Sequence, residues 1–180
     1  MNPDIFLHEF IEGEKTSVYN APHRYRVAIN SHNENFASDA LDLWNGMGRK
    51  VLSELCNKIR ELNFGGSFHF AVAPSHTEPF NTHIKAFILK EFPQSINLTS
   101  IFTKDQNFKA LGINQKLKEN DLIKKIWINE AGKGQITKDV NRIILLDDVF
   151  ANGNTFEAMK LAINKINPKT TFVTVTILKT

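Results

Sequence analysis

The stretch NRIILLDDVFANGNTFEAMK, residues 141–160, decides the fold of this chain. In it, four apolar residues run directly into two aspartates, Asp147 and Asp148. A nearly all-apolar run of this kind is typical of a strand that is buried on both faces of a sheet. After Gly153, apolar residues recur at three- and four-residue steps, which predicts a helix over 154–166. The stretch therefore predicts a buried strand, a polar glycine turn and a helix.

The remainder of the chain alternates between strand-like and helix-like segments. Apolar spacing predicts a helix over 36–62 with Ser38 as its N-cap, and a second helix over 79–93 with Pro79 in the first turn. Strands are predicted over 67–74, 97–102 and 171–178, a weak helical tendency over 104–128, and a loop over 129–139. This alternation predicts an α/β fold, a parallel sheet with helices on both faces.

The first 35 residues form a variable N-terminal segment with weaker signals. Residues 4–11 and 24–30 have strand-like composition, and the intervening NAPH, residues 20–23, has the composition of a turn. We therefore expect short extended pieces before the first helix.

Length and composition favour one globular domain, residues 1–180, in a reducing cytoplasmic setting. The chain is 42% hydrophobic and 23% charged, and its formal charge of +3 is too small to indicate a nucleic-acid partner by itself. The single cysteine, Cys56, excludes an intrachain disulfide and predicts a helix residue without chemistry. The sequence shows neither a signal peptide nor an apolar run long enough for a membrane span.

The glycine turn and the aspartates together predict a ligand site. Ligands of open α/β sheets bind beyond the carboxyl ends of the strands, where Asp147 and Asp148 are placed. The helix start that follows favours an anion, Gly153 allows close backbone approach, and Thr155 adds a hydroxyl. Carboxylates accept hydrogen bonds from sugar hydroxyls and can face a hydrated Mg²⁺ ion. A phosphorylated ribose presents this combination of groups.

The segment IILLDDVFANGNT resembles the phosphoribosyl-pyrophosphate (PRPP) signature of type I phosphoribosyltransferases. The resemblance implies that Asp147 and Asp148 hold the ribose hydroxyls. It also implies that the following loop holds the 5′-phosphate, through Ala151, Asn152, Gly153, Asn154 and Thr155. The sequence departs from the family at Ala151 and Asn152, where two threonines are common, so a hydroxyl contact is lost while the backbone donors remain.

A weaker match extends the resemblance toward the ComF-like branch of this family, over the core residues 66–180. The family's pyrophosphate loop follows an earlier strand, which here implies Pro74, Ser75 and His76. A loop that covers the site in the family corresponds to the Lys-rich residues 103–120, including Lys104 and Lys109. The resemblance thus implies a parallel-sheet, Rossmann-like phosphoribosyltransferase fold, without the N-terminal cysteine zinc module of many ComF-like proteins.

The activity that the resemblance implies is transfer of a phosphoribosyl group from PRPP to a nucleobase-like nitrogen, with Mg²⁺ held mainly through ligand and water and with no firm protein ligand. A homodimer is expected, since dimers are common in the family. The alternative is a regulatory module that binds PRPP or a nucleotide without transfer, because fold does not decide function. A nucleic-acid-handling role is a third option, supported only by the Lys-rich stretch and the ComF likeness. A Walker-B-like aspartate pair is disfavoured, because the chain has no Walker A pattern.

Overall fold

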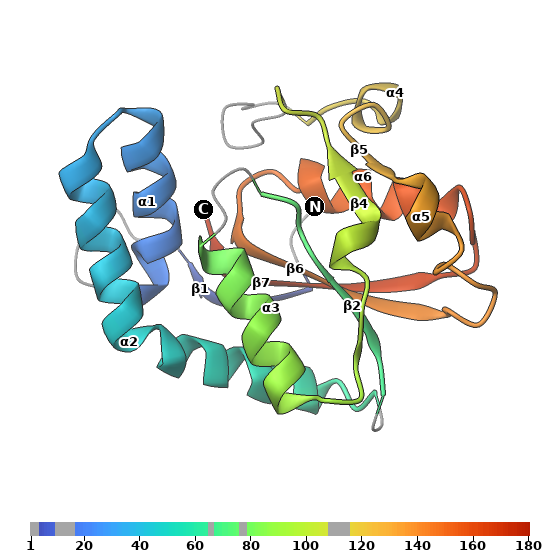
Figure 1. Cartoon of the computed structure of the whole chain (residues 1–180), viewed down its shortest axis with the longest axis horizontal. Coiled ribbons are helices and arrows are strands. Elements are labelled where there is room, and N and C mark those ends of the chain that lie inside the picture. The colour runs from blue at the N-terminus through green and yellow to red at the C-terminus, as the bar shows by residue number, and fades with distance from the viewer. Residues whose placement is uncertain (1–3, 10–16, 65–66, 76–78, 108–115) are drawn as a thin grey trace.

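A five-stranded parallel sheet organises the protein. The computed structural model describes residues 4–9, 17–64, 67–75, 79–107 and 116–180. The sheet has the order β1-β7-β6-β2-β3 (Figure 1), and all of its neighbouring strands run parallel. Its strands are β1 Ile5–Glu9, β2 His69–Val72, β3 Ile96–Asn97, β6 Arg142–Phe150 and β7 Thr171–Lys179. Two short strands, β4 Phe102–Lys104 and β5 Ile126–Ile128, form a separate antiparallel pair.

Helices cover both faces of the sheet, as the sequence predicts. One face packs against α1 Ala21–Asn30, α2 Glu34–Glu61 and α3 Pro79–Glu91, in a core that includes Phe70, Ile144 and Val175. The other face packs against α6 Asn154–Asn164 and the β4–β5 pair, in a core that includes Leu145, Phe156 and Met159. Smaller elements complete the chain: the 3₁₀ turns η1 Val18–Asn20 and η2 Thr99–Ile101, and the short helices α4 Glu119–Leu122 and α5 Glu130–Lys133. The architecture is α/β and is compatible with a Rossmann-like fold.

The strand order places a topological switch point between β2 and β6. From β2 the chain passes outward to β3 on one side, and from β6 it passes outward to β7 on the other. The two strands stay paired up to the carboxyl end of β2, where Val72 pairs with Leu146 and the Ala73 amide donates to the Leu146 carbonyl at 2.7 Å, and β6 continues beside β7 to Phe150. Crevices outside such switch points are where α/β sheets bind ligands. Asp147 follows Leu146 directly and so lies at this crevice.

The strand predicted over residues 24–30 is wrong, because this segment belongs to helix α1. Pro22 stands in the first turn of α1, where a missing N–H costs nothing, so NAPH begins a helix rather than a turn. Ala21 and Ala28 are fully buried on one side of α1, a helical spacing that the strand-like composition of the segment hides. α1 and α2 pack together beside the end of the sheet (Figure 1).

Several smaller expectations also differ from the structure. The N-cap of α2 is Asn33, not Ser38, and its side chain accepts from the Phe36 amide at 3.1 Å. The predicted strand over 97–102 is divided between β3, η2 and β4. The region 104–128 contains β5 as well as a short helix, and the predicted loop over 129–139 contains α5.

The expectation for Cys56 fits its surroundings. Its side chain is buried in α2, and burial, with the nearby charge of Glu91, raises the pKa of the thiol to about 12. A thiol of this kind stays protonated and is a poor nucleophile. Among the described residues, no helix has both the length and the apolar composition to cross a bilayer.

Candidate functional site

Asp147 and Asp148 lie near the carboxyl end of the central strand β6 and are both buried. Asp147 is 7% exposed and Asp148 is 0% exposed. The backbone amide of Asp148 donates to Oδ1 of Asp147 at 2.9 Å. Oδ2 of Asp148 is buried and has no hydrogen-bond partner among the described residues. Two adjacent buried carboxylates are costly unless a cation or hydrogen-bond donors compensate them.

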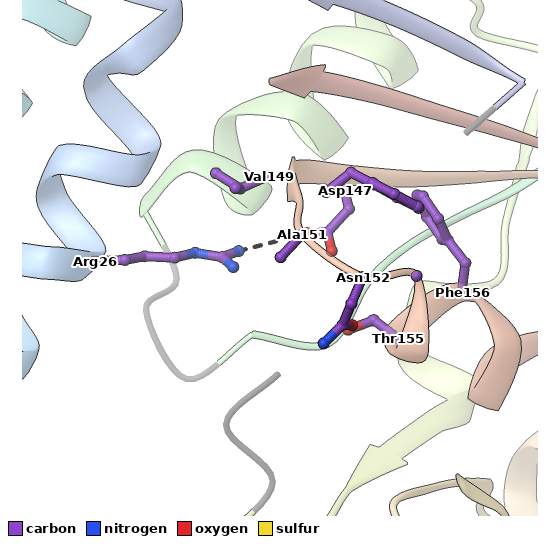
Figure 2. A pocket seen from close by; sticks show the side chains of 9 residues that line it. Arg26, Asp147, Val149, Ala151, Asn152, Thr155 and Phe156 are labelled. Carbon is purple, nitrogen blue, oxygen red and sulfur yellow. Dashed lines mark hydrogen bonds and ion pairs between the residues drawn. The ribbon is translucent and has the colours of Figure 1, made fainter. Parts of the chain in front are cut away.

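Arg26, from helix α1, supplies that compensation. Its Nη2 atom lies 3.4 Å from Oδ1 of Asp147 and closer still to Oδ1 of Asp148, with which it forms an ion pair. Figure 2 shows the guanidinium reaching from α1 toward Asp147 and Ala151. The side chain of Arg26 is only 12% exposed, so the ion pair is largely shielded from water. Helix α1 therefore supplies one positive charge against the two carboxylates at the end of β6.

The electrostatics of the cluster affect three titratable groups. Burial, together with the charge of Asp148, raises the pKa of Asp147 to about 7, although Arg26 opposes the shift. Burial lowers the pKa of Arg26, but the charges of Asp148 and Asp147 outweigh it and raise the pKa overall. Burial lowers the pKa of Lys104, against the opposing pull of Asp147. The protonated and ionised forms of Asp147 are therefore both populated near neutral pH.

The loop after β6 forms a small pocket with Arg26 and Asp147. Gly153 has φ 80° and immediately precedes α6, so the turn uses the left-handed conformation that favours glycine. The pocket has a volume of about 20 Å³, room for roughly one water molecule. It is lined by Arg26, Asp147, Val149, Phe150, Ala151, Asn152, Gly153, Thr155 and Phe156 (Figure 2). We call this the β6-end pocket.

The structure brings four of the five predicted loop residues, Ala151, Asn152, Gly153 and Thr155, to the β6-end pocket. Asn154 is the exception: it is fully buried, and its Oδ1 accepts from the Leu117 amide at 3.1 Å. Asn152 Oδ1 in turn accepts from the Asn154 amide at 3.1 Å. Asn154 thus ties the turn to the segment before α4, and its side chain does not line the pocket.

A second, larger pocket lies at the carboxyl end of β2, and we call it the β2-end pocket. Its volume is about 230 Å³, and its lining is Val72, Ala73, Pro74, Ser75, Asn81, Thr82, Lys85, Thr99 and Phe102. The predicted residues Pro74 and Ser75 are thus in this pocket, whereas His76 lies outside the described residues. Asn81 Nδ2 donates to the Ala73 carbonyl at 2.9 Å, which fixes the start of α3 against the end of β2.

The two lysines predicted for a covering loop have different outcomes. Lys104 is the last residue of β4 and pairs with Ile126 of β5, so its backbone belongs to a strand and not to a loop. The charges of Asp147, Arg26 and Asp148 affect the pKa of Lys104, so its ammonium group lies within electrostatic reach of this cluster. Lys109 lies outside the described residues. A covering loop stays a prediction.

Sequence reasoning missed Arg26, Asn81 and Lys85. Arg26 was hidden because the segment around it has strand-like composition, although Pro22 and the buried spacing of α1 could have shown a helix. Asn81 and Lys85 lie on the predicted helix 79–93, on the turns that follow the predicted pyrophosphate loop. Polar residues one and two helical turns after a ligand loop are a usable signal, because they lie near the helix start.

Comparison of the chain with models of protein families and with curated proteins finds no match to either.

Proposed function

We propose that this protein binds PRPP and transfers its phosphoribosyl group to a nucleobase-like nitrogen, as in the type I phosphoribosyltransferases that it resembles. One observation carries the proposal. At the switch point between β2 and β6, Asp147 of the buried aspartate pair, a left-handed glycine turn and a helix start surround one pocket, and a second pocket with polar groups lies at the end of the neighbouring strand. PRPP carries a pyrophosphate on C1 of the ribose, a diol on C2 and C3, and a phosphate on C5.

The aspartate pair suits the ribose hydroxyls. Carboxylate oxygens accept hydrogen bonds from a vicinal diol, and Asp147 presents its carboxylate to the β6-end pocket. Oδ2 of Asp148 has no partner among the described residues, but it is buried, so it would reach a hydroxyl only after local rearrangement. The turn Ala151–Gly153 and the hydroxyl of Thr155 offer donors at the start of α6, where the helix dipole favours a phosphate.

The β2-end pocket suits the pyrophosphate. Ser75 and Thr99 bring hydroxyl groups, and Lys85 brings a positive charge, to a space that is far larger than the β6-end pocket. In the transfer, the acceptor nitrogen forms a bond to C1 while the bond from C1 to the pyrophosphate oxygen breaks. The pyrophosphate leaves with the electron pair, and the nitrogen loses its proton. The residues here act by positioning and by charge stabilisation.

Mg²⁺ would neutralise charge on the pyrophosphate when it is bound. The carboxylate of Asp147 could face the ion, and that of Asp148 could do so after local rearrangement, in keeping with the preference of Mg²⁺ for one or two carboxylates plus water and phosphate oxygens. The described residues contain no group of three or more His, Cys, Asp or Glu side chains that could hold a metal.

The second candidate is a binding module without transfer. The observation that favours it is the closure of the β6-end pocket: its volume is about 20 Å³, and Asp148 is held by Arg26 and is inaccessible. Such a site would bind PRPP or a phosphoribosyl nucleotide only after local rearrangement, and it would serve regulation.

A direct assay separates these functions. The protein is incubated with PRPP, Mg²⁺ and a panel of nucleobases, and pyrophosphate release is measured beside calorimetric PRPP binding. Release that depends on a base supports the transferase. Saturable binding without release for any base supports the module, and absence of binding contradicts both. The double variant Asp147→Asn/Asp148→Asn should lose the Mg²⁺-dependent binding, and parental binding by it would contradict the site.

A further inference from the structure

We propose that Arg26 is a phosphate-binding residue, which bridges the aspartate pair and the phosphate of the ligand in the β6-end pocket. The proposal rests on the proposed function, since it takes the loop 151–155 as the phosphate cradle. It adds a residue from the N-terminal helix α1, outside the segment that resembles the family.

The hydrogen bonds of Arg26 leave part of its guanidinium free. Both of its bonds to the carboxylates, to Asp147 and to Asp148, use the same atom, Nη2. Its Nε is buried and has no partner among the described residues. A guanidinium carries five N–H donors in a fixed fork, so one edge can hold carboxylates while other donors meet a second anion. A buried donor without a partner is costly. Because the β6-end pocket has room for roughly one water molecule, a phosphate oxygen would satisfy this donor once the pocket widens.

The charges around the β6-end pocket favour the same assignment. Among the described residues that line it, Arg26 is the only cation and Asp147 is the only anion. A phosphate held by the loop alone would therefore face the Asp147 carboxylate with no positive charge between them. Arg26 places its positive charge between the two, because it both contacts Asp147 and lines the pocket.

The ligand class follows from this geometry. A phosphomonoester that also carries a vicinal diol would use both halves of the site, with the hydroxyls on the carboxylates and the phosphate on Arg26 and the loop. A free sugar without phosphate would not use the guanidinium. Ribose 5-phosphate and ribose are therefore the discriminating pair of probes.

Calorimetry of the full chain with these probes tests the proposal. Arg26→Lys keeps the charge that balances the aspartates but loses the planar fork, and Arg24→Lys is the matched control. Arg24 lies on the same helix, where it stacks 4.7 Å from the centre of the Phe36 ring. We expect Arg26→Lys to weaken ribose 5-phosphate binding at least tenfold, and Arg24→Lys to change it less than twofold. Binding of ribose should be equally weak in all three proteins.

The outcomes separate the two proposals. If the parent binds ribose 5-phosphate and Arg26→Lys binds it equally well or more tightly, Arg26 is not a phosphate ligand, and the proposed function stands. If the parent binds neither ribose 5-phosphate nor PRPP, the proposed function fails and Arg26 loses its role with it.

A measurement on the parent covers the case in which Arg26→Lys does not fold. Ribose 5-phosphate should slow amide hydrogen exchange in residues 21–30, because the bound phosphate ties α1 to the loop. Unchanged or faster exchange there, with slower exchange in residues 151–160, would overturn the proposal.

Discussion

The two pockets at the switch point differ in size and in the charges that line them. The β6-end pocket is small, and its polar character comes from a buried ion-pair cluster of Arg26, Asp147 and Asp148. The β2-end pocket is about 230 Å³ in volume, and its lining is divided between apolar and neutral polar residues, with Lys85 as its cation. The first has room for roughly one water molecule, whereas the second is far larger.

This difference shows where binding and stability are coupled. The two charges of a buried ion pair have lost their hydration, so removing one partner leaves an uncompensated charge in the interior. A partly exposed lysine keeps much of its hydration, and its removal affects little besides the ligand. Removal of Arg26 should therefore alter folding and binding together, and removal of Lys85 should alter binding alone.

The largest effect is expected for Arg26→Met. This change leaves two buried carboxylates without their cation, and the free energy of unfolding should fall by about 3–5 kcal/mol. Urea denaturation at pH 8, where an Asp147 with a pKa near 7 is ionised, measures the loss. Arg24→Met, which removes the same charge from the same helix, should cost less than half as much. If the free energy of unfolding falls equally in the two variants, the contact of Arg26 with the two aspartates adds no particular stability.

The next effect is a dependence of stability on pH. Because the pKa of Asp147 is raised from 3.8 to about 7 in the folded protein, the folded state binds the extra proton between these values. The contribution of Asp147 is therefore fully present below pH 4 and is lost as the pH rises toward 7, by an amount on the order of 2–4 kcal/mol.

The comparison with Asp147→Asn isolates this contribution from those of His23 and His69, whose pKa values burial lowers. The free energy of unfolding of the parent minus that of Asp147→Asn should decrease between pH 5 and pH 8. A flat difference would mean that Asp147 is ionised throughout, with its charge fully compensated by Arg26.

The sequence predicts the aspartates and the turn of the β6-end pocket, but it does not predict the contact of Arg26 with these aspartates. The strand, the aspartates and the glycine turn are local in the chain, so composition and periodicity reveal them. Arg26 meets Asp148 across 122 positions of sequence, and no local pattern reports a contact of that kind. The strand-like residues around Arg26 also masked the helix, because packing against α2 decides the conformation of α1.

A smaller effect is expected for Gly153→Ala. At φ 80° an alanine is strained, and the change should lower the free energy of unfolding by about 1–2 kcal/mol. Gly46→Ala is a control of opposite sign, because Gly46 lies within α2 and an added Cβ there meets nothing within 4 Å. That change should stabilise the protein by about 0.5–1 kcal/mol. If Gly153→Ala is neutral, the turn does not need its left-handed geometry.

The smallest effect on folding, and the sharpest test of the comparison, is expected for Lys85→Met. Loss of one partly buried charge should weaken pyrophosphate binding about tenfold, roughly 1.4 kcal/mol, because a neutral thioether cannot pair with the anion. Ribose 5-phosphate binding and the free energy of unfolding should change little, since Lys85 lines only the β2-end pocket of the two.

Lys90→Met, on the last turn of the same helix, controls for a general change in charge. If Lys85→Met weakens both ligands equally, the pockets act as one anion site. If only pyrophosphate binding weakens, the two pockets bind different parts of the ligand. The β6-end pocket then binds the ribose 5-phosphate part, and the β2-end pocket binds the pyrophosphate.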